Sequence, residues 1–238
     1  MNPVDPARDR RGRAAPAGRA RGRPATVESI VGAGRALLRQ GRAVTLRAVA
    51  TELGCTAPAL YRYIDGAAAL GELLSEDVFV EVVGELTAAG EPYGEDDPAA
   101  RLVAAATAFR GWALDNRAEF RLVFGAARGG GSGAEPFAGP LGGVLTRLVR
   151  QWPPPGPEGA EPDGALAAWA QLYGIVALEV FGHVRPRLIR SGALFRAVMR
   201  EVGARAGAAG DGDRLAEVSR EVLARRALTG RAVPAPGG

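Results

Sequence analysis

The stretch 44-VTLRAVATELGCTAPALYRY-63 decides the fold of the N-terminal part of this chain. Thr45 can cap a helix, and apolar residues follow it at the i, i+3, i+4, i+7 spacing that builds one buried face. These apolar residues are Leu46, Val49, Ala50 and Leu53. Gly54 allows the left-handed backbone that closes a helix, and Thr56 can cap a second helix with Pro58 in its first turn. We predict two short helices joined by a tight glycine turn, the second about two turns long.

This pair of helices has the layout of a helix-turn-helix, which places its second helix in a DNA major groove. A preceding helix should start after Thr26 and end at Gly41, and its buried stripe makes it a brace rather than a reader of bases. The stripe consists of Val27, Ile30, Val31, Gly34, Leu37 and Leu38. A longer helix from about 67 to 88 leads onward, and we expect it to transmit movement to the second part of the chain.

The motif resembles the tetracycline-repressor (TetR-like) family through Thr45-Leu46-Arg47-x-Val49-Ala50-x-x-Leu53-Gly54-Cys55-Thr56-x-Pro58-x-Leu60-Tyr61-x-Tyr63, and the similarity extends over 23–79. The resemblance implies an all-α fold: an N-terminal three-helix helix-turn-helix DNA-binding domain and a C-terminal helical ligand-binding and dimerisation domain. It also implies a homodimer on double-stranded DNA with a palindromic operator, and a small-molecule effector. We expect an arginine-rich arm (1–23), a DNA-binding domain (24–85, motif 45–64), a regulatory domain (91–230) and a tail (231–238).

Roles in DNA recognition follow from the same resemblance. Thr56, Ala57 and Ala59 would face base edges, and the two alanines would touch thymine methyl groups rather than form hydrogen bonds. One departure is Ala67, because family members often carry a phosphate-binding lysine at that place. The predicted phosphate contacts are Tyr61, Arg62 and Tyr63, and the further candidate contacts are Thr45 and Arg47.

Charge is distributed unevenly along the chain. Residues 1–70 hold 12 Arg against 5 acidic residues, a net of +7, whereas residues 71–238 hold 18 Arg against 21 acidic residues, a net of −3. Phosphate neutralisation dominates DNA affinity. A basic part joined to a mildly acidic one is therefore typical of a DNA-binding protein whose second part has a separate function. The arm has almost no large apolar side chain, and we expect it to be disordered in the free protein.

Within the arm, Arg21-Gly22-Arg23-Pro24 resembles the core of an AT-hook, in which an arginine pair enters a narrow minor groove. A solvated basic tail is the alternative interpretation, and the sequence leaves both open. Either role would raise non-specific DNA affinity, so Arg21 and Arg23 are included among the candidate DNA contacts.

Several classes of protein are disfavoured by composition. No apolar run reaches the length of a membrane span, and no apolar segment of a signal peptide follows the first arginines, so we expect a cytoplasmic protein without membrane contact. The single cysteine, Cys55, excludes a disulfide framework and a cysteine-rich zinc site. With one histidine, no nucleophile elbow and no glycine-rich nucleotide fingerprint, an enzyme is poorly supported, and we expect no cofactor and no metal.

Residues 164–184 are apolar on more than one face, which predicts a helix buried on several sides. This segment and the apolar stripe in 191–206 cannot both be covered within one small domain, so we expect a symmetric dimer. The series Trp169-x-x-Leu172-Tyr173-Gly174-Ile175-Val176-Ala177-Leu178-Glu179-x-x-Gly182-His183 resembles the ligand-domain signature of one TetR subgroup, with its Trp, His-Gly pair and Leu-Glu. Tyr173 replaces the usual His.

The second domain also holds a set of aromatic residues that we predict to bind the ligand. They are Phe109, Trp112, Phe120, Phe124, Trp169 and Tyr173. Core packing and an apolar pocket are both open interpretations of this set. A repressor released by an apolar ligand accounts for the sequence best, and a ligand-independent activator or architectural protein is the alternative. A cavity of roughly 300 Å³ or more would favour the sensor.

Overall fold

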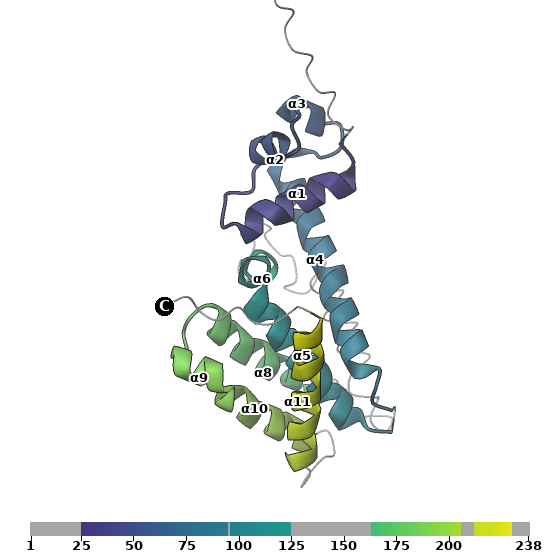
Figure 1. Cartoon of the computed structure of the whole chain (residues 1–238), viewed down its shortest axis with the longest axis vertical. Coiled ribbons are helices and arrows are strands. Elements are labelled where there is room, and N and C mark those ends of the chain that lie inside the picture. Colours follow the sequence, from purple (N-terminus) through teal and green to yellow (C-terminus); the bar gives the residue numbers. More distant parts are fainter. Residues whose placement is uncertain (1–24, 95, 125–162, 206–211, 230–238) are drawn as a thin grey trace, which may run out of the picture.

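The computed structural model describes residues 25–94, 96–124, 163–205 and 212–229, and all regular structure in these segments is helical (Figure 1). The helices are α1 (Val27–Arg39), α2 (Leu46–Glu52), α3 (Ala57–Leu60), α4 (Gly66–Gly90), α5 (Pro98–Asp115), α6 (Arg117–Phe124), α8 (Asp163–Val180), α9 (Pro186–Ser191), α10 (Ala193–Arg205) and α11 (Gly212–Leu228). The predicted all-α fold is confirmed. The arm (1–23) and the tail (231–238) lie outside the described residues.

Helices α1 to α3 pack with the first half of α4 around one core. Thr26 caps α1 as predicted: its Oγ1 accepts from Ser29 N at 3.1 Å, and Ser29 Oγ accepts from Thr26 N at 2.9 Å. The most deeply buried residues of this N-terminal core are Ile30, Leu37, Val49, Ala50, Leu60, Ile64, Leu70 and Leu74. The prediction that the whole α1 stripe is buried was wrong for two residues. Val27 is 42% exposed on the rim of an open groove between α1 and α4, and Leu38 is only half-buried.

The turn between α2 and α3 has the predicted geometry. Gly54 adopts a φ of +65°, and the chain folds back so that Cys55 N donates to Ala50 O at 2.9 Å. The predicted length of the second helix was wrong, because α3 is a single turn. After Leu60 the next buried residue is Ile64, and the three residues between them are exposed, so no apolar contact extends the helix.

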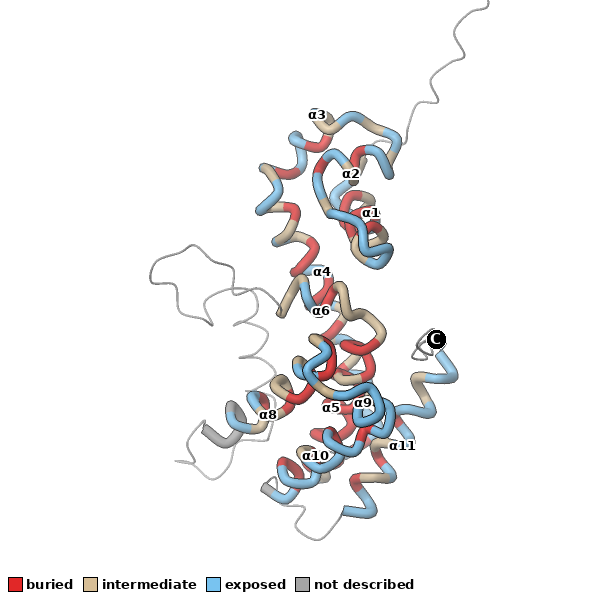
Figure 2. Tube along the Cα trace, turned by 90° about the vertical axis from the view of Figure 1, so that its left-hand side faces the viewer, coloured by how far each residue is buried: buried red, intermediate tan, exposed pale blue. Residues whose placement is uncertain are grey.

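Helix α4 connects two cores along its length (Figure 2). Leu70 and Leu74 belong to the N-terminal core, whereas Val78, Val82 and Leu86 belong to a second core with α5, α6, α8 and α10. Helix α11 packs on α5 through a third cluster that includes Leu215, Val218 and Val222. A shift of α4 would therefore be felt in both cores.

The short helix α9 was not predicted from the sequence. None of its described residues is buried, so no apolar period indicated a helix there. It ends at Gly192, which adopts a φ of +61°. None of the helices in the described segments combines the length and apolar character needed to cross a membrane.

Candidate functional site

The predicted DNA-reading helix, α3, lies at the end of the molecule farthest from α8 to α10 (Figure 1). Tyr61 is 59% exposed and Tyr63 is 40% exposed, and the Arg62 guanidinium carbon lies 5.8 Å from the centroid of the Tyr63 ring. Thr56 is also exposed. The three predicted phosphate contacts thus form one exposed cluster of hydrogen-bond donors after α3.

The other predicted DNA contacts are placed less uniformly. Ala57 and Ala59 are half-buried, and Ala57 packs against the N-terminal core. Thr45 is exposed but serves as the cap of α2, where its Oγ1 accepts from Ala48 N at 3.1 Å. Arg47 is exposed on α2. Arg21 and Arg23 lie outside the described residues.

The basic charge of residues 1–70 is used in more than one way. Seven of the twelve arginines belong to the arm, and five lie in the described part. Arg35 and Arg39 bind the carboxylate of Glu119, so their charge is balanced inside the molecule. Arg42 pairs with Glu52, which leaves Arg47 and Arg62 as the described basic residues of this region that make no ion pair with another described residue. The arginine excess thus overstates the charge that this module presents.

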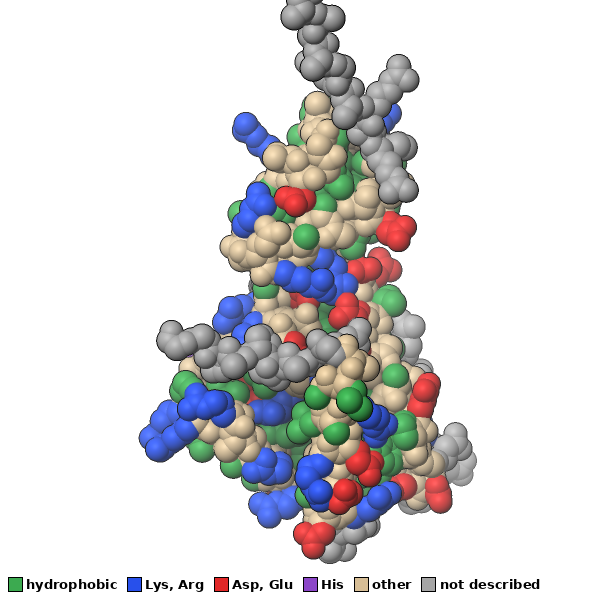
Figure 3. Space-filling view, in the orientation of Figure 1, with side chains coloured by type: hydrophobic (Ala, Val, Ile, Leu, Met, Phe, Trp, Pro, Cys, Tyr) green, Lys and Arg blue, Asp and Glu red, His purple; other side chains and the backbone are tan. Residues whose placement is uncertain are grey.

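An ion cluster joins α1 to α4 and α6, and we call it the Arg35 cluster. Its members are Arg35, Arg39, Asp77, Glu81 and Glu119. The three guanidinium nitrogens of Arg35 donate to Asp77 Oδ2 at 2.8 Å, to Glu81 Oε2 at 2.6 Å and to Glu119 Oε1 at 2.8 Å. Figure 3 shows basic and acidic side chains side by side at the level where α1 meets the lower helices. Arg35 thus fixes α1 to two helices of the rest of the chain.

Arg35 and Glu119 are the most buried members of the Arg35 cluster. The side chain of Arg35 is 11% exposed and that of Glu119 is fully buried, and Glu119 Oε2 has no hydrogen-bond partner among the described residues. Burial opposes the charge of Arg35, yet the hydrogen bonds to the three carboxylates raise its pKa above the ordinary value. Burial also opposes the charge of Glu81, but the hydrogen bond from Arg35 outweighs it and lowers the pKa of the Glu81 carboxyl.

Two further arginines tie helices together in the second part of the chain. Arg226 of α11 donates to Glu85 of α4 and, at 2.8 Å, to Asp115 of α5. Arg110 of α5 donates through Nε to Glu179 of α8 at 2.7 Å and through Nη2 to the carbonyl of Ile189 at 2.6 Å. Neither set of ion pairs was predicted from the sequence.

The six predicted ligand residues lie together. Trp112 belongs to the same core, and the rings of the other five form a continuous set of contacts, including Phe109 to Trp169 at 5.3 Å and Phe120 to Phe124 at 4.7 Å between centroids. Phe109, Trp112 and Phe120 are fully buried and Trp169 is nearly so, while Phe124 and Tyr173 remain half-buried at the edge. The Tyr173 hydroxyl donates to Phe124 O at 3.0 Å, and burial raises the pKa of Tyr173. We call this set the aromatic cluster.

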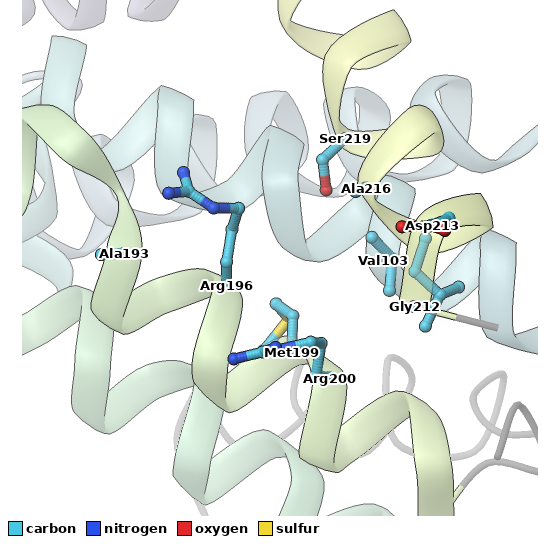
Figure 4. Close-up of a pocket in the computed structure, with 10 residues that line it drawn as sticks. Val103, Ala193, Arg196, Met199, Arg200, Gly212, Asp213, Ala216 and Ser219 are labelled. Carbon is cyan, nitrogen blue, oxygen red and sulfur yellow. The ribbon is translucent and has the colours of Figure 1, made fainter. Parts of the chain in front are cut away.

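A cavity of about 400 Å³ lies elsewhere, between α5, α10 and α11 (Figure 4). Its lining combines apolar side chains with polar ones from α10 and α11. The lining residues are Val103, Ala193, Arg196, Met199, Arg200, Gly212, Asp213, Leu215, Ala216 and Ser219. This volume is above the lower limit of roughly 300 Å³ expected of a sensor site, but no residue of the aromatic cluster lines the cavity.

Comparison with known proteins agrees with the architecture. Residues 102–202 match the family model described as "Tetracyclin repressor-like, C-terminal domain". The HTH-type transcriptional regulators Rv1816 of Mycobacterium tuberculosis and Mb1846 of Mycobacterium bovis are each 34% identical to the chain over 116 residues. That match covers 48% of this chain and 48% of each relative, so the chain spans about half the length of the curated relatives it matches.

A solved structure supports the fold. The crystal structure of SCO4313, a protein with a proposed regulatory role, superposes with a TM-score of 0.55 and 24% sequence identity, covering 74% of this chain and 94% of that one. This likeness concerns the fold alone. Residues 102–202 are thus similar to a tetracyclin repressor-like C-terminal domain, and the chain is similar to HTH-type transcriptional regulators over 48% of its length.

Proposed function

We propose that this chain is a sequence-specific DNA-binding transcriptional regulator, and a repressor that a small apolar ligand releases from DNA. The exposed cluster of Tyr61, Arg62 and Tyr63 beside α3 carries the proposal, because a helix-turn-helix presents these positions to the DNA backbone. The names of the relatives, which are HTH-type transcriptional regulators, favour the same function. Thr56 and Ala59 then face bases, with Arg47 as an added contact.

We further propose that residues 24–85 form the DNA-binding domain and residues 91–230 the regulatory domain. The two cores joined by α4 support this division. The pattern of Trp169 with Leu178-Glu179 leads us to place the chain in the TetR subgroup with a Trp and His-Gly signature, with Tyr173 in place of the usual His. The arm, through Arg21 and Arg23, would add contacts in the minor groove.

The regulator is proposed to act as a homodimer on a palindromic operator. Leu178 of α8 is 45% exposed and Leu194 of α10 is 38% exposed, although these two helices pack against each other. Apolar side chains left uncovered on neighbouring helices are typical of a surface that a second copy buries. A dimer would set two α3 helices about one DNA turn apart.

The most specific part of the proposal is that a ligand releases the protein from DNA. Phe124 and Tyr173 are half-buried at the edge of the aromatic cluster, and the proposed apolar ligand packs against them. The complete burial of Phe109, Trp112 and Phe120 favours the alternative, a ligand-independent regulator whose second domain is filled. The dye 1-anilinonaphthalene-8-sulfonate separates the two: its emission should rise with the wild type and fall with Tyr173→Ala, while Ala216→Leu, which fills the α10–α11 cavity, leaves it unchanged.

DNA binding itself is tested by selection from a randomised duplex library. We expect the wild type to enrich a palindrome, and fluorescence anisotropy on that duplex should show binding that is tighter by orders of magnitude than on an unrelated duplex. Enrichment of no sequence at all would reject the proposed function.

A further inference from the structure

Each of the two carboxylate oxygens of Glu81 accepts a hydrogen bond from a different helix. Its Oε2 accepts from Arg35 Nη2 of α1 at 2.6 Å, and its Oε1 accepts from Trp112 Nε1 of α5 at 3.2 Å. Trp112 lies in the second core among the aromatic residues, whereas Arg35 belongs to the helix that braces the DNA-reading pair. One side chain of α4 therefore connects the aromatic core to the helix-turn-helix module.

We infer that Arg35 and Glu81 are the residues that position the helix-turn-helix on the regulatory domain, and that Trp112 acts on DNA binding through Glu81. The inference rests on the proposed function and adds the side chains that connect its two parts. A shift of Trp112 moves Glu81, Glu81 moves Arg35, and Arg35 lies on the helix packed against α2 and α4.

Arg35 suits this role because its planar fork holds three carboxylates at once. Asp77 and Glu81 come from α4 and Glu119 comes from α6, so the guanidinium fixes α1 relative to two helices. A lysine would offer a single charged nitrogen and could not keep all three directions. Gly34, next to Arg35, lets the helices approach closely, since a β-carbon there would lie 2.9 Å from Leu74 Cδ2.

Asp77 provides the matched control within the same cluster. Its side chain is 46% exposed, and its only described partner is Arg35 at 2.8 Å. Glu81 is more buried, at 26% exposed, and also accepts from Trp112. Glu81→Gln and Asp77→Asn each remove one negative charge facing Arg35, but only the first changes the group that Arg35 shares with Trp112.

The experiment measures affinity for a duplex that the wild type selects from a randomised library. Glu81→Gln keeps an oxygen for Trp112 but offers Arg35 no carboxylate, so the module loses its preorganised position. We expect Glu81→Gln to weaken binding by about fivefold or more, within the usual range of coupling between sites. Asp77→Asn should stay within about twofold of the wild type, because an exposed ion pair contributes little.

Trp112→Phe tests the other half of the link, because it keeps an aromatic ring but removes the indole N–H. If Trp112 acts through Glu81, the double variant should bind about as weakly as Glu81→Gln alone. Independent, additive losses would overturn the inference, and so would equal effects of Glu81→Gln and Asp77→Asn. A merely structural role for Trp112 predicts additivity.

A measurement without DNA keeps this inference separate from the proposed function. Spin labels at Gln40→Cys, on the exposed end of α1, and at Ala224→Cys, on α11, report the distance between the two parts in a Cys55→Ala background. Glu81→Gln should shift or broaden the distance distribution, whereas Asp77→Asn should not. Unchanged distances in both variants overturn the inference even if DNA binding is found, and a wild type that selects no duplex rejects the proposed function alone.

Discussion

Gly111 of α5 lies directly against the guanidinium of Arg226 from α11: a β-carbon at position 111 would come within 2.6 Å of Arg226 Nε. This close approach lets Arg226 reach Asp115 at 2.8 Å and Glu85 on α4. Because the three side chains are each at most 13% exposed, a displaced arginine would leave two carboxylates buried without their partner. The absence of a side chain at position 111 is therefore a requirement of the ion pairs.

We expect Gly111→Ala to lower the free energy of unfolding by about 1–3 kcal/mol, the usual cost of overpacking. Urea unfolding followed by circular dichroism measures this loss. The matched control is Gly84→Ala, since Gly84 is exposed in α4 and a β-carbon there meets no atom within 4 Å. Alanine at that helical position should raise stability by about 0.5–1 kcal/mol. Equal changes in the free energy of unfolding of Gly111→Ala and Gly84→Ala would show that the contact with Arg226 is not what makes position 111 sensitive.

Glu179 should give the fold an unusual dependence on pH. It is fully buried, and burial raises the pKa of its carboxyl above the ordinary value of 4.5 although Arg110 offsets part of the rise. A carboxyl that holds its proton more tightly in the folded chain than in the unfolded chain stabilises the fold as the pH falls. The free energy of unfolding of the wild type, relative to Glu179→Gln, should thus increase as the pH falls through the folded-state pKa.

The relative increase should level off below the unfolded-state pKa, because the carboxyl is then protonated in both states. Urea unfolding of both proteins at a series of pH values checks the trend. A wild type that loses stability relative to Glu179→Gln over the same range would show that Arg110 governs the titration instead.

Local signals were sufficient to predict most of the fold. The caps at Thr26 and Thr45, and the left-handed turn at Gly54, depend on a few adjacent residues, so their geometry was readable. The length of α3 could not be predicted from local signals, because it depends on what the residues after Leu60 pack against. Helix α9 buries none of its described residues, and a helix without a buried face leaves no apolar period in the sequence.

The ion pairs across helices were not predicted, because pairing between distant residues depends on how the helices are arranged. One signal was present: Asp77, Glu81 and Glu85 recur at a spacing of four on α4 and so share one face. An acidic face on a helix between two cores indicates that arginines from other helices cover it. Arg35 and Arg226 do so, but no pattern in the sequence identified those two among thirty basic residues.

Arg62 should contribute to DNA affinity without contributing to sequence preference. Its guanidinium lies over the Tyr63 ring at an exposed site, and none of the described carboxylates pairs with it. We expect Arg62→Ala to weaken selected and unrelated duplexes by the same factor and to reduce the slope of log affinity against log salt by about 0.9 per lost phosphate contact. Arg187→Ala, at an exposed site on α9, is the charge-matched control and should leave the slope unchanged. A loss confined to the selected duplex would place Arg62 at a base.

The proposed dimer depends on the exposed apolar side chains of α8 and α10. Leu178 is 45% exposed on α8, and a charge buried there at an interface between two copies would be strongly unfavourable. We expect Leu178→Arg to sediment as a monomer at micromolar concentrations at which the wild type is a dimer, while its circular dichroism spectrum stays helical.

Leu223 supplies the comparison that separates an interface from an ordinary exposed leucine. It is 46% exposed, almost the same as Leu178, but lies on α11. Leu223→Arg should therefore remain a dimer, because a solvated arginine on a free helix face costs little. If both variants dimerise, the contact between copies is not built on the α8 face. If the wild type is itself a monomer, two α3 helices cannot be held at a fixed spacing, and a palindromic operator loses its physical basis.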